Sequence, residues 1–164
     1  MNPDLEKLKP YPFERLNNLL SQVTPNPELR PISLSIGEPK HPAPQIVLDE
    51  LKKEIQKVSF YPSTKGLPEL REAISTWATK RFSLASLSSE TQVLPVNGTR
   101  EALFAFTQAV IDRTKSPLVI SPNPFYQIYE GASYLAGADL HLLPTLEDNN
   151  FIPDYDAVSE ETWK

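Results

Sequence analysis

The chain has 164 residues, of which 40% are hydrophobic and 23% are charged, an ordinary composition for a globular protein with a core of its own. The formal net charge of -5 argues against nucleic acid as a partner, because no basic face is present to neutralise phosphates. The chain has no cysteine, which excludes disulfides, and no leader-like or bilayer-length apolar run, so we expect a cytoplasmic protein with no membrane partner.

Proline is dense at the beginning of the chain, between Pro3 and Pro44. Residues 1–31 contain one short amphipathic stretch, PFERLNNLL, and otherwise predict an arm that lies on another surface. Residues 32–36 (ISLSI) alternate in the manner of a short strand. A helix is predicted from Pro44 to about Lys57, because proline suits a first helical position and apolar residues then recur at helical spacing.

Strands and helices alternate in the rest of the chain. After the polar turn at 61–66 (YPSTKG), Pro68 opens a helix over 68–82, and a serine-rich link follows. Apolar runs predict strands, and periodic segments between them predict helices, one of which Gly137 closes as a left-handed cap. The predicted order is strand 93–96, helix 99–112, strand 117–121, helix 126–136, strand 139–143 and the start of a last short helix.

This alternation predicts the α/β class, with a mainly parallel sheet and helical crossovers. In such folds, ligands collect at the carboxyl ends of the strands. Binding residues are therefore expected where strands end.

The turn VNGTREAL (96–103) is the first candidate. Asn-Gly between apolar residues is typical of a hairpin, but good helix formers follow it, so the turn joins a strand to a helix. The backbone N–H groups of Thr99 and Arg100 would then face outward at the positive end of the helix dipole, where a phosphate fits. Simple capping of the helix by Asn97 or Thr99 is the alternative.

The second candidate is the loop NPFYQIY (123–129), which follows the next strand. Its aromatic rings could stack on a flat cofactor or could belong to the core. Other chemistry is not indicated: His41 and His141 are isolated, which predicts no metal site, and no pair of carboxylates stands out.

Four sequence blocks together resemble the class I/II group of fold-type I pyridoxal-phosphate aminotransferases. Each block is weak alone, but they occur in order over nearly the whole chain. The sequences of the last two blocks are most similar to those of the succinyldiaminopimelate aminotransferases of lysine biosynthesis. The blocks are SIGEP (35–39), YPSTKGLPELREAI (61–74), VNGTREAL (96–103) and NPFYQIYEGASYLAGA (123–138).

The resemblance implies pyridoxal 5'-phosphate as cofactor. Gly98, Thr99 and Arg100 would bind its phosphate through backbone N–H groups, and Tyr126 would stack on its pyridine ring. At the 96–103 turn, the resemblance thereby favours an anion site over simple capping.

The resemblance also implies a homodimer with a shared active site. Tyr61 would reach the phosphate of the neighbouring subunit, and the arm would cross the partner. Gly37, with Ile36 beside it, would lie against the substrate carboxylate.

In this family, three essential residues lie beyond the point matched by Lys164. They are the Schiff-base lysine, the aspartate that binds the pyridinium nitrogen and the arginine that binds the substrate carboxylate. We therefore assign no catalytic residue here and expect the chain alone to be inactive. The expected fold is a partial three-layer α/β/α large domain with an arm and part of the small domain. The expected divisions are 1–31 (arm), 32–43 (small domain) and 44–164 (N-terminal portion of the large domain). In the family sheet, the first strand of the large domain lies at one edge and the next two lie at the other.

The function implied is transfer of an amino group between an L-amino acid, with glutamate as the expected donor, and an oxo acid. N-succinyl-2-amino-6-oxopimelate is the preferred acceptor. Two alternatives stay open: a pyridoxal-phosphate-dependent lyase, and a non-catalytic remnant that dimerises or binds phosphate.

Overall fold

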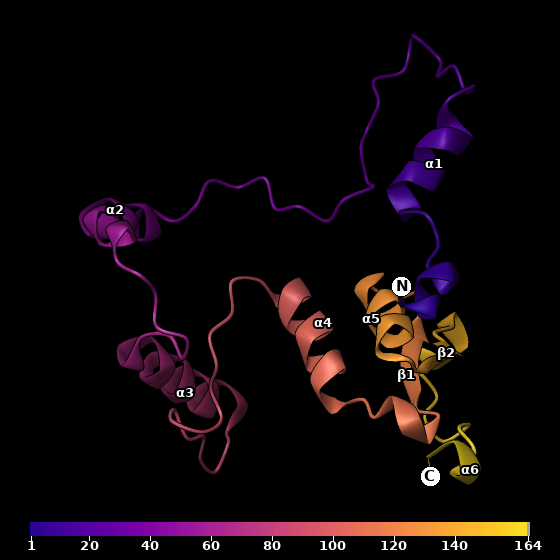
Figure 1. Ribbon diagram of the computed structural model, residues 1–164. Helices are drawn as coiled ribbons and strands as arrows, with labels where there is room; N and C mark the ends of the chain where they lie inside the picture. Colours follow the sequence, from indigo (N-terminus) through magenta and orange to yellow (C-terminus); the bar gives the residue numbers. More distant parts are fainter. Residues whose placement is uncertain (164) are drawn as a thin grey trace. The chain divides into compact units, whose positions relative to one another are not determined.

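The computed structural model describes residues 1–163, which form two compact units (Figure 1). Unit 1 comprises Met1–Val23 and the residues from Val96 onward, and unit 2 comprises Thr24–Pro95. The predicted boundaries at 31/32 and 43/44 concern domains of the whole family fold, and they stay a prediction.

A parallel pair of strands is the centre of unit 1. Strand β1 (Leu118–Asn123) pairs with β2 (Asp139–Pro144), with Leu118 opposite Asp139 at one end and Asn123 opposite Pro144 at the other. Helix α5 (Ile128–Ala136) connects the two strands, as a parallel pair requires. The α/β prediction is thereby confirmed, and the two strands that pair are the two expected to share one edge of the family sheet.

Small side chains let α5 lie close to the strands. Ala132, Ser133 and Ala138 are essentially inaccessible, and Leu143 and Val158 complete the buried set. The helix ends at Gly137, whose φ of 85° is readily adopted only by glycine and whose N–H group donates to the carbonyl of Tyr134 at 2.9 Å. The predicted cap is confirmed.

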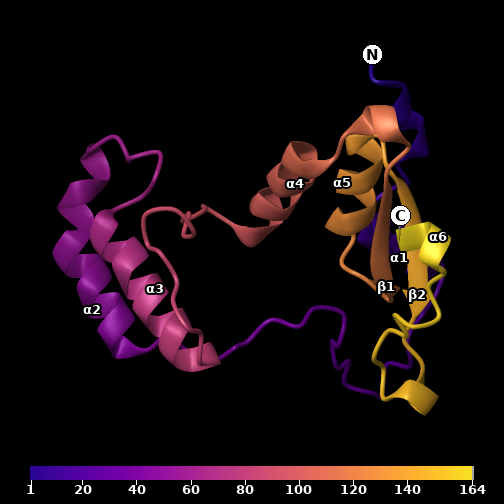
Figure 2. The same ribbon diagram turned by 90° about the horizontal axis from the view of Figure 1, so that it is seen from below.

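Helix α4 (Thr99–Val110) packs against α5 (Figure 1). Gln108 strengthens this packing, because its Nε2 donates to the carbonyl of Ala132 at 3.0 Å. Figures 1 and 2 show α4 running opposite in direction to β1, so the first turn of α4 lies toward the carboxyl end of that strand. Unit 1 also contains the short 3₁₀ helices η3 (Arg113–Lys115) and η4 (Glu147–Asn149), which the sequence did not predict. The predicted last short helix is found as α6 (Glu160–Trp163).

The N-terminal arm contributes two helical segments to unit 1. The 3₁₀ helix η1 spans Pro3–Lys7 and contacts α5, and α1 spans Pro12–Leu20. The apolar face of α1 is exposed, most strongly at Leu19 (77%).

Unit 2 is helical. It contains α2 (Gln45–Glu54), which continues as the 3₁₀ helix η2 (Ile55–Ser59), and α3 (Pro68–Phe82), which ends at Ser83 in a left-handed conformation. The serine-rich link folds back along α3, since Arg71 donates to the carbonyl of Ser89 at 2.9 Å and Ser75 donates to that of Leu87 at 2.6 Å.

Two predicted strands are wrong. Residues 32–36 and 93–96 are irregular, and the sheet found within residues 1–163 has two strands. A strand forms only where a neighbour accepts and donates its backbone hydrogen bonds. Neither segment has such a neighbour in the described part of the chain, and Pro95 lacks an N–H group to contribute. Leu34 (89% exposed) accordingly has no sheet face to cover.

Candidate functional site

The turn before α4 is the centre of the candidate site. Gly98 is the N-cap residue in extended conformation (φ 172°, ψ 139°), and its carbonyl accepts the N–H of Ala102 at 3.2 Å. Among the described residues, no side chain caps this helix, so the capping alternative involving Asn97 or Thr99 is not found. The amides of Thr99 and Arg100 are therefore left without the side-chain partner that most helix starts have.

The carboxylate of Glu101 lies close to the same turn. A Cβ placed on Gly98 would be 2.6 Å from Oε2 of Glu101, so glycine leaves the space into which this side chain folds. Glu101 is in the first turn of α4, where the helix dipole favours negative charge. An anion bound at Thr99 and Arg100 would compete with this carboxylate. Sequence reasoning identified the turn but not its competing charge.

Tyr126 presents an aromatic ring after β1. The residue is 48% exposed, and its ring and that of Tyr129 are nearly perpendicular, with centroids 6.0 Å apart and an interplanar angle of 83°. The carbonyl of Tyr126 accepts the N–H of Tyr129 at 2.9 Å, which ties the loop to α5. Tyr126 is thus in contact with one neighbouring ring while about half of the residue is exposed, so it is accessible to a flat ligand.

The strand end that precedes Tyr126 is also fixed. The carbonyl of Asn123 accepts both the N–H (2.9 Å) and the hydroxyl (3.0 Å) of Thr145, the residue that follows β2. Next to Tyr126, the Oε1 atom of Gln127 is buried and has no hydrogen-bond partner within residues 1–163. No pattern in the sequence singled out Gln127.

The other predicted site residues, Ile36, Gly37 and Tyr61, belong to unit 2. Tyr61 is 98% exposed, Ile36 is 66% exposed, and nothing lies within 4 Å of a Cβ placed on Gly37. Their roles stay predictions. Unit 1 therefore contains Gly98, Thr99, Arg100 and Tyr126 of the predicted set.

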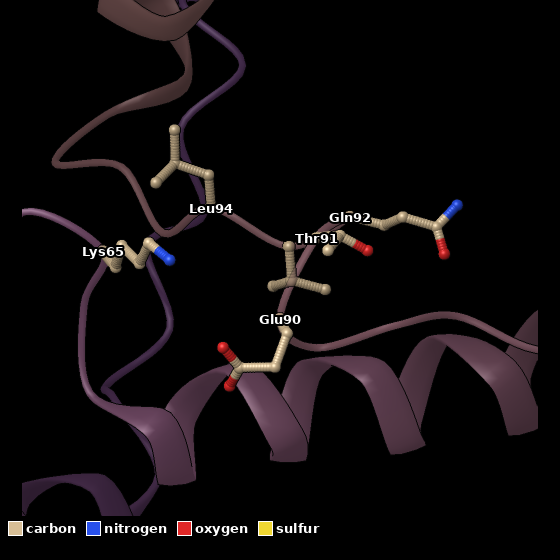
Figure 3. A pocket seen from close by; sticks show the side chains of 6 residues that line it. Lys65, Glu90, Thr91, Gln92 and Leu94 are labelled. Atoms are coloured by element: carbon tan, nitrogen blue, oxygen red, sulfur yellow. The ribbon is translucent and has the colours of Figure 1, made fainter.

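Unit 2 also has a shallow cavity of about 370 Å³ (Figure 3). Glu90 and Lys65 bring opposite charges to its wall, and the segment Thr91–Leu94 completes the lining. The cavity contains none of the predicted site residues, and its lining offers neither histidine nor cysteine for nucleophilic chemistry.

The described residues contain neither of two common features. In residues 1–163, no cluster of three or more histidine, cysteine, aspartate or glutamate side chains is arranged to hold a metal ion. Within the same range, no helix is both long and apolar enough to cross a membrane.

The described part of the chain is thus an α/β protein in which helix α4 starts without a side-chain cap and an exposed aromatic ring follows the end of strand β1. The model of the family aminotransferase class I and II matches residues 30–162. The chain belongs to this family, whose members depend on pyridoxal phosphate.

Curated relatives and solved structures agree with this assignment. The chain is 35% identical over 159 residues to an LL-diaminopimelate aminotransferase of Dehalococcoides mccartyi, covering 96% of this chain and 40% of the relative. It is 35% identical to the enzyme of the same name from Oleidesulfovibrio alaskensis, covering 98% of this chain and 41% of the relative. The chain thus spans about two fifths of the length of the curated relatives that it matches.

Among solved structures, an aminotransferase from Neisseria meningitidis is similar over the whole chain, with 42% identity and a TM-score of 0.89, and 42% of that structure is covered. The aminotransferase AspB of Helicobacter pylori has 36% identity and a TM-score of 0.82, with 94% of this chain and 39% of that structure covered. The predicted partial aminotransferase fold is confirmed.

Proposed function

We propose that this chain is the N-terminal part of a pyridoxal-phosphate-dependent aminotransferase and that it supplies the phosphate-binding turn and the ring-stacking residue. The observation that carries the proposal is the uncapped start of α4 at Gly98, Thr99 and Arg100, in the same unit as the exposed ring of Tyr126. Family membership supports it.

The residues fit the cofactor's two ends. A phosphate needs N–H donors and positive potential, which the first turn of α4 provides without a competing side-chain cap. An aromatic ring needs a flat apolar face, which Tyr126 provides while Tyr129 holds its position. When bound, pyridoxal phosphate supplies an electron sink that permits an amino group to be exchanged with an oxo acid.

This chain's residues would bind and orient rather than transfer protons. Thr99 and Arg100 would donate backbone hydrogen bonds to the phosphate, and the hydroxyl of Thr99 could add a third. Glu101 would turn away as the phosphate enters, since two negative charges cannot share the turn. The proton-transferring lysine is proposed to lie outside this chain, which alone would not catalyse transamination.

The active site is proposed to form between two subunits. Tyr61 is fully available to reach a neighbouring molecule, which fits a contact to the partner's phosphate. Ile36 and the open backbone at Gly37 are proposed to lie against the substrate carboxylate. The small-domain and large-domain divisions and a cytoplasmic location are proposed with the same assignment.

Glutamate is proposed as amino donor, and two oxo acids are candidate acceptors. The sequence blocks favour N-succinyl-2-amino-6-oxopimelate, whereas the name of the curated relatives favours the oxo acid from which transamination yields LL-diaminopimelate. Both compounds place the function in lysine biosynthesis.

Cofactor binding can be tested on the chain itself. We expect pyridoxal phosphate to bind and its ³¹P resonance to shift. Thr99→Pro removes the backbone N–H of position 99. The helix should tolerate it, because proline suits a first helical position and Gly98 already has the extended conformation that a residue before proline prefers. Thr99→Val removes only the hydroxyl and is the matched control.

Thr99→Pro should weaken binding about fivefold or more, because an amide to a charged phosphate is a charge-assisted bond. Thr99→Val should weaken it less, and Glu101→Gln should strengthen it. Tyr126→Ala should weaken binding more than Tyr126→Phe, which keeps the ring. Equal affinities across this series would overturn the site.

Activity is tested on a protein of family length that contains this chain. Glutamate should be converted to 2-oxoglutarate when an acceptor is present, and the 164-residue chain should give no product. The substrate is identified by the reverse reaction, in which LL-diaminopimelate or its N-succinyl derivative donates an amino group to 2-oxoglutarate. The rates of glutamate formation from the two donors are compared. Elimination products instead of glutamate would indicate a lyase, and cofactor binding without turnover by the long protein would indicate a non-catalytic remnant.

A further inference from the structure

The first nine residues are held against α5 by polar contacts. Asn2 donates from Nδ2 to the carbonyl of Leu135 at 3.5 Å, and its Oδ1 accepts the N–H of Asp4. Asp4 lies in the first turn of η1 and is 8% exposed, which is rare for an aspartate unless it is paired. The contact with Leu135 joins residues 133 positions apart in the chain.

Arg113 is the partner that permits this burial. Its Nη2 donates to Oδ2 of Asp4 at 2.8 Å, and Nζ of Lys7 lies 3.2 Å from the other carboxylate oxygen. Arg113 reaches this position by lying against Gly137, where a Cβ would be 2.9 Å from the Cβ of Arg113. The glycine that caps α5 thus also makes room for the arginine that holds the chain's beginning.

A second ion pair fixes the end of the segment. Nζ of Lys9 lies 2.9 Å from Oε1 of Glu130, whose side chain is 15% exposed. The hydrogen bond from Lys9 to Glu130 raises the pKa of the lysine above its ordinary value, and the Glu130 charge adds to this. Nζ of Lys7 also lies 5.9 Å from the ring centre of Tyr134 and 4.0 Å from Asp139. Charges of both signs on the segment therefore meet their complements: Asp4 meets Arg113 of η3, and the two lysines meet carboxylates of α5 and the start of β2.

We infer that residues 2–9 form a strap that docks on α5 of its own chain, anchored at Asp4, so that only the part of the arm beyond Pro10 is free to reach another molecule. Pro10 and Pro12 flank Tyr11, which makes the connection to α1 stiff and short. The arm expected from the sequence to cross a partner is thus divided into a docked strap and a projecting helix whose apolar side is exposed. Because the anchor is ionic, the strap is released by salt.

The strap can be tested by hydrogen exchange of the 164-residue chain. Asp4→Asn keeps the size of the side chain and removes its charge, and the amides of α5 should exchange about fivefold faster, because a charge-assisted bond at a nearly buried site is lost. Glu6→Gln removes the same charge from an exposed position of η1 and is the matched control, with exchange expected to equal that of the original chain. Trypsin should cut after Lys7 faster in Asp4→Asn than in Glu6→Gln.

A second variant and two conditions keep the test decisive. Lys9→Gln should also speed exchange at α5, and 1 M salt, with a screening length of about 3 Å, should move the original chain toward Asp4→Asn while changing that variant little. Protection of α5 should be independent of protein concentration. Identical behaviour of Asp4→Asn and Glu6→Gln would overturn the strap, and protection that falls on dilution would show that the segment docks on a second copy.

Discussion

Gly66 lies directly against the ring of Pro95, so that a Cβ at position 66 would be 2.8 Å from the proline Cγ. The φ of Gly66 is 75°, a conformation that glycine adopts without strain. The turn YPSTKG is thereby fixed to the residue that ends unit 2, two positions before Asn97. Gly66 and Pro95 therefore hold the two ends of this part of unit 2 in contact.

Gly66→Ala should destabilise unit 2. The left-handed conformation costs a non-glycine residue about 1–2 kcal/mol, and the contact with Pro95 adds to this cost. Urea unfolding followed by Trp77 fluorescence, in a Trp163→Phe background, reports on unit 2 alone. Gly37→Ala, which meets no atom within 4 Å, is the control and should change the unfolding free energy by less than about 0.5 kcal/mol. Equal effects of the two substitutions would contradict this account.

The two glycines of the α5 region should respond in opposite directions. Gly131 is inside the helix with open space where a Cβ would lie, so Gly131→Ala should stabilise the chain by about 0.5–1 kcal/mol. Gly137→Ala places a methyl group against Arg113 at a positive φ and should destabilise it. Thermal unfolding monitored by circular dichroism at 222 nm measures both. A loss of stability in Gly131→Ala would show that its surroundings are tighter than the structure indicates.

Arg71 should matter far more than Glu90, although the two form an ion pair at 3.2 Å. Arg71 is 5% exposed and donates to the carbonyl of Ser89, so Arg71→Ala removes a charged donor and leaves that carbonyl without it. We expect a loss of about 1.5–3 kcal/mol and faster exchange of the amides in the link 84–92. The Glu90 side chain is 67% exposed, so Glu90→Gln should change stability by less than about 1 kcal/mol. If both variants unfold alike, the ion pair rather than the backbone bond holds the link.

Asp112 should titrate below its ordinary value of 3.8. The hydroxyl of Thr114 lowers the pKa of this carboxyl most, followed by the Thr114 N–H, while the hydrogen bond from Lys115 contributes least. Because the pKa is lower in the folded chain, the stabilisation is complete above pH 3.8 and is lost as the pH falls through the lowered value. Thr114→Val should raise the pKa more than Lys115→Gln, as measured by the carboxyl carbon resonance. The reverse order would refute this assignment of causes.

Local patterns predicted the helices well and two of the strands poorly. Helices 68–82 and 99–110 form from hydrogen bonds within the segment, so periodicity, Pro68 and the turn at Gly98 were sufficient. The pair 118–123 and 139–144 was also predictable, because the helix between them brings the strands together. Residues 32–36 and 93–96 have the composition of strands, but their pairing depends on neighbours that no local pattern reveals.

The candidate site divides in the same way. The anion turn was recognisable because glycine, threonine and a following helix are adjacent in sequence. Glu101 folding over Gly98 and the unpaired Oε1 of Gln127 depend on side-chain conformations, which sequence spacing does not determine. The Asp4–Arg113 pair joins positions 109 apart, and proline-rich composition gave no sign that the arm begins with an ionic anchor.

The two-strand sheet has a consequence for how the chain behaves in solution. Each strand is bonded on one side, so β1 and β2 both offer a second row of backbone donors and acceptors that no residue of 1–163 occupies in a ladder. Such rows are templates on which an extended peptide can add by main-chain bonds alone. A synthetic peptide with alternating apolar and lysine residues should therefore bind to the free edge of the sheet. Copies of the chain could pair through the same edges, so the protein should be kept at low concentration to avoid fibre formation.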